Sequence, residues 1–180
     1  MELNSSRLSL QEVSMDDLPL VHALHLIPEL DEYNTLGIPS DEEETRKVMQ
    51  PAVDDQQQET RSQFCWKIEL KELGQCIGLA GMFLSNDRFR LGEIYYKIHP
   101  DFWGNGYATE VAQLLVRFGF EDLKLHKVEA GVATENVRSV RVLEKIGMVR
   151  EGLRRKILPI RGEWKDNFHY AIVEDDPRDY

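Results

Sequence analysis

Trp103-Gly104-Asn105-Gly106-Tyr107-Ala108 is the stretch of sequence from which we predict the fold. It lies between a strand-like segment ending near His99 and an amphipathic segment starting near Thr109. Two glycines permit positive φ angles and close backbone approach, so successive N–H groups can converge at a helix start whose dipole favours an anion. The stretch therefore predicts a pyrophosphate-binding loop. The alternative is a tight turn that binds nothing.

A second block follows about thirty residues later. Asn136-Val137-Arg138-Ser139 precedes Leu143-Glu144-Lys145-Ile146-Gly147-Met148, and Asn136 and Gly147 suit the two ends of a helix. Together the two blocks resemble the GNAT acetyltransferases. They are most similar to the branch of ribosomal-protein alanine N-acetyltransferases, whose loop reads W-G-x-G-[hydrophobic]-A-x-E.

The resemblance extends from about Arg7 to Ile172, but the chain departs from one general feature of the family. The broad signature [Q/R]-x-x-G-x-[G/A] falls on Trp103, Gly106 and Ala108, so a tryptophan replaces the polar first residue. That replacement fits the ribosomal branch. It also removes a polar side chain as a phosphate partner.

Periodicity predicts a mixed α/β fold with a largely antiparallel central sheet flanked by helices, in a single domain 1–180 with its core at about 7–173. Residues alternate with period two through three successive segments, which indicates an antiparallel meander. The predicted strands are 7–13, 64–70, 76–84, 91–99, 127–133, and a hairpin of 148–157 and 166–173 turning at 159–162. The predicted helices are 15–28, 40–49 ending before Pro51, one after the glycine loop to about 119–122, and 136–147, with 54–63 as a loop.

Charge and composition exclude several classes of protein. Lys and Arg total 22 against 32 Asp and Glu, a net charge of −10, which opposes non-specific binding of nucleic acid or of an anionic membrane. Cys65 and Cys76 lack metal-ligand spacing, so no metal is expected. The start of the chain lacks a signal-peptide pattern and no apolar run approaches 18 residues, so we expect a soluble, cytoplasmic protein.

Other catalytic motifs are missing. A dinucleotide-binding loop needs a third Gly or Ala where this chain has Thr109, and no P-loop, G-x-S-x-G or H-E-x-x-H motif occurs. An anionic cofactor would need a local basic patch. Arg138, Arg141 and Lys145 recur at helical spacing and can supply it, although a solvated helix face explains them equally well.

The resemblance implies acetyl-CoA as the acetyl donor, with its pyrophosphate on the backbone N–H groups of the glycine loop. Its thioester arm would lie between two splayed strands, Leu91 to His99 and Lys127 to Ala133. The residues implied in cofactor binding are Ile98, His99, Trp103, Gly104, Asn105, Gly106, Tyr107, Ala108, Thr109, Asn136, Ser139 and Arg141.

The resemblance also implies two catalytic residues. Glu93 matches a glutamate that commonly serves as a base through water, whereas the alternative is an ordinary surface carboxylate. Ser139 would protonate the leaving thiolate, and Asn136 would orient the pantetheine arm, unless it only caps its helix. Asp166 and Tyr170, on the last strand, are weaker candidates for acceptor contacts.

The predicted function is acetyl transfer to a primary amine, carried by a small molecule or by a protein N-terminus, in a ternary complex. The alternative is a catalytically silent CoA-binding module on the same fold, because a fold does not guarantee activity. Many members of the family are dimers, so a homodimer stays open, although the sequence gives no interface signal.

Overall fold

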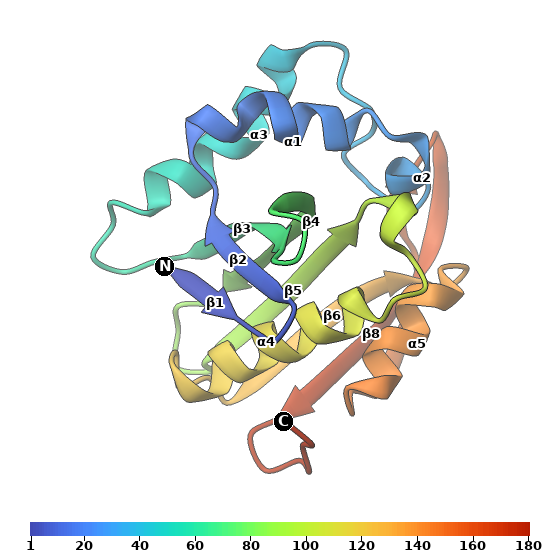
Figure 1. Cartoon of the computed structure of the whole chain (residues 1–180). Helices are drawn as coiled ribbons and strands as arrows, with labels where there is room; N and C mark the ends of the chain where they lie inside the picture. Colours follow the sequence, from blue (N-terminus) through green and yellow to red (C-terminus); the bar gives the residue numbers. More distant parts are fainter.

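The computed structural model describes all 180 residues and is built around one eight-stranded sheet (Figure 1). The strand order is β1-β2-β3-β4-β5-β6-β8-β7, and every neighbouring pair is antiparallel except β5 and β6. The strands are β1 (Glu2–Asn4), β2 (Leu8–Glu12), β3 (Gln63–Leu70), β4 (Gln75–Leu84), β5 (Leu91–Ile98), β6 (Lys127–Ala133), β7 (Val149–Ile160) and β8 (Glu163–Val173). The predicted mixed α/β class with a largely antiparallel sheet is confirmed.

Helices cover both faces of the sheet (Figure 1). On one face, Val111 and Leu115 of α4 (Tyr107–Glu121) pack in the main core with Ile94 and Ile98 of β5. The same core includes Leu143 of α5 (Val137–Lys145). On the other face, a smaller cluster joins α1 (Leu18–His25) and α3 (Glu42–Asp55) to β4 through Val21, Met49 and Leu79. None of the helices combines the length and apolar character needed to cross a membrane.

The second predicted helix was placed wrongly at its C-terminus. We expected it to end before Pro51, but α3 continues through Pro51 to Asp55, so the predicted loop 54–63 is shorter. Proline normally disrupts a helix interior because it lacks an N–H group and crowds the preceding turn. Here tertiary contacts hold the last turn, since Ala52 is buried and the Asp55 carboxylate accepts hydrogen bonds from Ser62 and Arg61.

Two further boundaries differ from the prediction. The C-terminal strands continue to Ile160 and resume at Glu163, so the turn is only Arg161-Gly162, with φ angles of +50° and +78°. Two consecutive positive φ angles match the twist of a two-residue hairpin turn, which lets the strands pair to their ends. The first predicted helix stops at His25, and Pro28 begins a short helix, α2 (Pro28–Asp31).

The parallel pair β5 and β6 parts after three residues. Leu91, Gly92 and Glu93 pair with residues 127–129, and the pairing ends there, although both strands continue. The predicted splay of these two strands is therefore present. It leaves an opening in the middle of the sheet, towards the C-terminal ends of both strands.

Candidate functional site

The glycine loop leads directly into α4. Gly104 and Gly106 have φ angles of +80° and +79°, which L side chains rarely adopt, and Gly106 is the N-cap of the helix. No side chain caps this helix end. The first N–H groups of the helix therefore remain available to an anion, and the helix dipole adds to the attraction.

Trp103 fixes one side of this loop. Its indole N–H donates a 2.6 Å hydrogen bond to the carbonyl of Ile98, at the end of β5, and the guanidinium of Arg138 on α5 lies 3.7 Å from its ring centroid. Asn105 donates from its amide to the carbonyls of Phe102 and Trp103. The tryptophan that departs from the general signature thus ties the loop to a strand and to a second helix.

Arg7 holds the other side of the loop, a role that sequence reasoning missed. Its guanidinium donates to the carbonyl of Asn105 at 3.0 Å and to the carboxylate of Glu110 at 2.7 Å, and it lies over the ring of Tyr107. Burial alone would raise the pKa of Glu110, but hydrogen bonds from Ser5 and Arg7 lower it below its usual range. This contact explains the glutamate that ends the W-G-x-G-x-A-x-E pattern of the loop, since Glu110 anchors Arg7.

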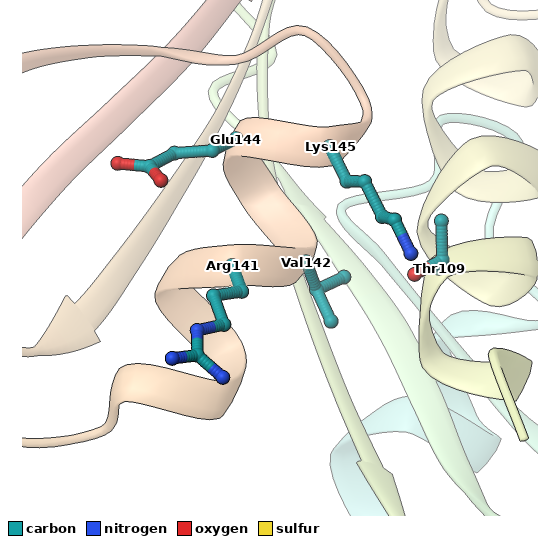
Figure 2. A pocket seen from close by; sticks show the side chains of 5 residues that line it. All are labelled: Thr109, Arg141, Val142, Glu144 and Lys145. Atoms are coloured by element: carbon teal, nitrogen blue, oxygen red, sulfur yellow. The ribbon is translucent and has the colours of Figure 1, made fainter. Parts of the chain in front are cut away.

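A hollow of about 480 Å³ lies between the N-terminal turn of α4 and α5 (Figure 2). Lys145 points across it towards Thr109, Glu144 points away, and Arg141 lies one turn earlier on α5. Neither Arg141 nor Lys145 has a carboxylate within ion-pair distance. These two cations are therefore free to meet a phosphate. A second hollow, which also borders Thr109 and Lys145, reaches Gly106 and Arg7.

Backbone groups line the opening between β5 and β6. The N–H of His99 bonds to Ile77 and the carbonyl of Leu91 accepts from Ser85, so odd-numbered residues of β5 direct their backbone groups to β4. Tyr96 and Ile98, which alternate with them, direct theirs to the opening, beyond the last β6 pairing. His99 itself faces β4 through its backbone, and its ring accepts from the N–H of Asp101. The structure therefore does not bring His99 to the opening.

Asn136 and Ser139 meet β5 from the side of α5. The side-chain Oδ1 of Asn136 accepts a 3.2 Å hydrogen bond from the backbone N–H of Ser139, so the structural role as an N-cap is present. The Ser139 hydroxyl lies 3.1 Å from that of Tyr96. Burial raises the pKa of Tyr96 to about 12, so its hydroxyl stays protonated at neutral pH. Sequence reasoning missed Tyr96 as a site residue, although the alternation along the strand placed it on the face opposite Glu93.

Glu93 lies on the opposite face of the sheet from Ser139. It is exposed, at the last residue pair before β5 and β6 part, and its side chain has no hydrogen bond or ion pair to another residue. The two predicted catalytic residues are therefore separated by the sheet and reach the opening from its two sides. Tyr170, in contrast, is fully buried beneath α5 and donates to Glu144, which removes it from the acceptor side.

Comparison with known proteins identifies the family. The family model described as "Acetyltransferase (GNAT) domain" matches residues 7–149. The chain therefore belongs to the GNAT acetyltransferase family, and the resemblance predicted from the two sequence blocks is confirmed.

Two curated relatives come from Bacillus subtilis. The uncharacterized N-acetyltransferase YnaD is 42% identical over 47% of this chain and 49% of its own length. The putative ribosomal N-acetyltransferase YdaF is 31% identical over 56% of this chain and 55% of its own length. The matched part thus spans about half the length of each of these relatives.

Two solved structures match almost the whole chain. A GNAT-family acetyltransferase from Bacillus anthracis is 30% identical with a TM-score of 0.83, covering 98% of this chain and 100% of that one. Spermidine N-acetyltransferase from Vibrio cholerae, in complex with CoA and spermine, is 24% identical with a TM-score of 0.84, covering 96% and 98%. At 24% identity, the match to the second structure shows only that the two proteins share a fold.

Proposed function

We propose that this GNAT-family chain transfers an acetyl group from acetyl-CoA to a primary amine, which attacks the thioester directly. The observation that carries the proposal is the opening between β5 and β6, which lies between the glycine loop and the exposed carboxylate of Glu93. An opening that joins an anion-binding helix start to the other face of a sheet suits a long anionic acyl carrier.

The donor's phosphates would be held by both backbone and side chains. N–H groups from Gly104 to Thr109 converge at the start of α4, and the free cations Arg141 and Lys145 border the adjacent hollow. These local charges offset the net charge of −10, which by itself would repel coenzyme A. Membership of the GNAT acetyltransferase family supports acetyl-CoA as the co-substrate of this chain.

The opening supplies hydrogen-bond donors for the reaction. As the amine attacks, negative charge develops on the acetyl oxygen, and the N–H groups of Tyr96 and Ile98 are directed where they can stabilise it. The hydroxyls of Tyr96 and Ser139 then donate to the sulfur as the carbon–sulfur bond breaks. Because a thiol has a pKa near 8.5, the thiolate needs only modest help to leave.

Glu93 would take the proton from the amine, directly or through water, on the face opposite the departing sulfur. An α-amine with a pKa near 8 is roughly one-tenth neutral at pH 7, whereas a lysine amine is neutral in only about one molecule in a few thousand. A protein N-terminus or a small molecule with a weakly basic amine is therefore the acceptor class that needs least assistance.

The test is calorimetry with CoA and acetyl-CoA, followed by a thiol-release assay over a panel of amines. We expect both carriers to bind, and thiol release to require one class of amine. Absence of heat with either carrier would contradict the proposal, and binding without thiol release for any amine would support the silent CoA-binding module. A cytoplasmic location, a single domain over 1–180 and a homodimer remain predictions.

A further inference from the structure

Lys97 of β5 lies on the same face of the sheet as Glu93 and is not used by the proposed reaction. Side chains alternate along a strand, so residues 93, 95 and 97 project to one face, opposite α4. Leu79, which pairs with Lys97 across β4, packs on that face against α1 and α3. Lys97 therefore projects to the side from which an acceptor amine would approach.

The position of Lys97 along the strand places it beside the proposed thioester. It stands between Tyr96 and Ile98, whose N–H groups are directed to the opening and would bind the acetyl oxygen. One residue of a strand spans only about 3.3 Å, so the flexible four-carbon side chain of Lys97 can bring its nitrogen to the acetyl carbon. Tyr95 leaves this path free, because its ring turns over β4, where a Cβ added to Gly81 would collide with it.

The amine of Lys97 lacks the partners that hold two other lysines of this face. Lys97 is half-buried, yet its ammonium has no hydrogen bond and no carboxylate within ion-pair distance. Lys67 of β3, in contrast, donates to Asp17 at 2.7 Å. Lys127 of β6 donates to Glu151 at the same distance. Of these three lysines, only Lys97 has a nitrogen that is free to move to a bound reagent.

The surroundings of Lys97 also favour the uncharged form of its amine. Burial lowers the pKa of Lys97, and the nearby Cys65 and Asp31 oppose that change only in part. The hydrogen bond to Glu151 instead raises the pKa of Lys127. An unperturbed lysine is neutral in only about one molecule in a few thousand at pH 7, and only the neutral amine is a nucleophile. Lys97 is therefore more reactive than an exposed or paired lysine.

We propose that Lys97 is a self-acetylation site, whose amine attacks the acetyl group of bound acetyl-CoA when no acceptor is present. The neutral nitrogen forms a bond to the acetyl carbon as the carbon–sulfur bond breaks. The nitrogen loses one proton and the departing thiolate gains one, so the products are an acetyl-lysine amide and free CoA. The inference rests on the proposed acetyl transfer, because it uses the same donor and the same opening.

Self-acetylation would be limited to one event per chain, unlike transfer to a free amine. A lysine held beside the thioester needs no second encounter, so it reacts whenever no acceptor competes for the acetyl group. The amide formed removes the positive charge of Lys97 near Asp31 and stands where an acceptor would approach. The modification would therefore mark chains that hold acetyl-CoA without an acceptor.

The test is mass spectrometry of the purified protein after incubation with acetyl-CoA and no amine. We expect the protein to gain the mass of one acetyl group, and peptide fragmentation to locate that group on Lys97. The initial rate of labelling at Lys97 should exceed that at Lys67 and at Lys127 about tenfold or more, because a paired ammonium is not a nucleophile. Dilution of the protein at saturating acetyl-CoA should leave the rate constant unchanged, because the reaction occurs within one molecule.

Controls separate this reaction from chemical acetylation of surface lysines. Excess free CoA, which competes for the carrier site, should suppress labelling of Lys97 but not of the exposed Lys47 on α3. Lys97→Arg keeps the positive charge and should lose the labelling, with wild-type CoA affinity by calorimetry, because a guanidinium is not deprotonated in proteins. Lys127→Arg, on the other side of the opening, is the matched control and should be labelled like the wild type.

The outcomes distinguish this inference from the proposed function. Acetylation of Lys97 without thiol release to any external amine would support self-acetylation and count against transfer to a free acceptor. Thiol release to an external amine, with Lys97 unmodified after incubation without amine, would sustain the acetyltransferase and overturn the self-acetylation site. Labelling of Lys97 that persists in excess free CoA, or that only equals the labelling of Lys47, would also overturn it.

Discussion

Replacing Gly106 by alanine isolates the contribution of the loop backbone to cofactor binding. Gly106 has a φ angle of +79°, and an added Cβ would meet only Arg7, at 3.7 Å, which is an ordinary contact. The substitution is therefore strained through its backbone and not through crowding. Holding an L residue in this left-handed region costs about 1–2 kcal/mol.

That strain must lower either the free energy of unfolding or the affinity for CoA. If the loop relaxes to a negative φ angle, its N–H groups no longer converge, and CoA must restore the original geometry when it binds. A binding cost of about 1–2 kcal/mol corresponds to a Kd raised about 5- to 30-fold. Gly106→Val, which is β-branched, should lose CoA binding altogether while the protein stays folded.

Gly37 provides the matched control. It has nearly the same φ angle, +76°, no atom within 4 Å of an added Cβ, and a position in the loop between α2 and α3. Gly37→Ala should lower the free energy of unfolding by about 1–2 kcal/mol and keep wild-type CoA affinity. Calorimetry with CoA and urea denaturation measure the two effects. Wild-type CoA affinity in Gly106→Ala, with a stability loss equal to that of Gly37→Ala, would refute the assignment of the loop as the pyrophosphate site.

Four other outcomes follow from the structure. Tyr96→Phe removes the hydrogen bond to Ser139, so we expect the free energy of unfolding to fall by about 0.5–1.5 kcal/mol. We also expect a lower kcat with unchanged CoA affinity, and a wild-type kcat would exclude Tyr96 from the reaction. Glu93→Gln should lower kcat at saturating acetyl-CoA without weakening CoA binding, and wild-type turnover would end its role as a base. Lys145→Gln should weaken CoA binding about two- to fivefold and reduce its dependence on salt, as titrations at two ionic strengths would reveal. Burial alone would raise the pKa of Asp55, but hydrogen bonds from Ser62, Gln63 and Arg61 hold that pKa below its usual range. The contribution of Asp55 to stability is therefore present above the unfolded pKa near 4 and is lost as the pH falls towards the folded value. Between pH 5 and 2, the free energy of unfolding measured by urea denaturation should change less with pH in Asp55→Asn than in the wild type, and identical slopes would contradict this linkage.

Local sequence was sufficient for the parts of the fold that depend on local chemistry. The period-two alternation through 64–70 predicted β3 almost to the residue, because its buried and half-buried side chains alternate without interruption. The two glycines marked the loop correctly, since both adopt positive φ angles. Tertiary contacts explain the boundaries that were predicted wrongly. At Pro51, for example, the sequence alone predicts the end of a helix, but the contacts of Asp55 stabilise one more turn of α3.

The sequence predicted which residues belong to the candidate site better than it predicted the contacts between them. The sequence indicated Trp103, Gly106 and Ser139, but gave no sign that Arg7 would anchor the glycine loop from nearly a hundred residues away. Tyr96 was missed for a related reason. It matters through Ser139, which lies across from it on a neighbouring element, and no single segment encodes that information.

The interrupted pairing of β5 with β6 also has a consequence for the resistance of the protein to proteases. Only three residue pairs join the two halves of the sheet, so a carrier seated in the gap would act as a missing strand between them. A ligand that binds only the native state adds RT ln(1 + [L]/Kd) to its stability. Removal of the carrier, whether CoA or acetyl-CoA, would therefore leave this seam more open to proteases, and limited proteolysis should slow when either is added.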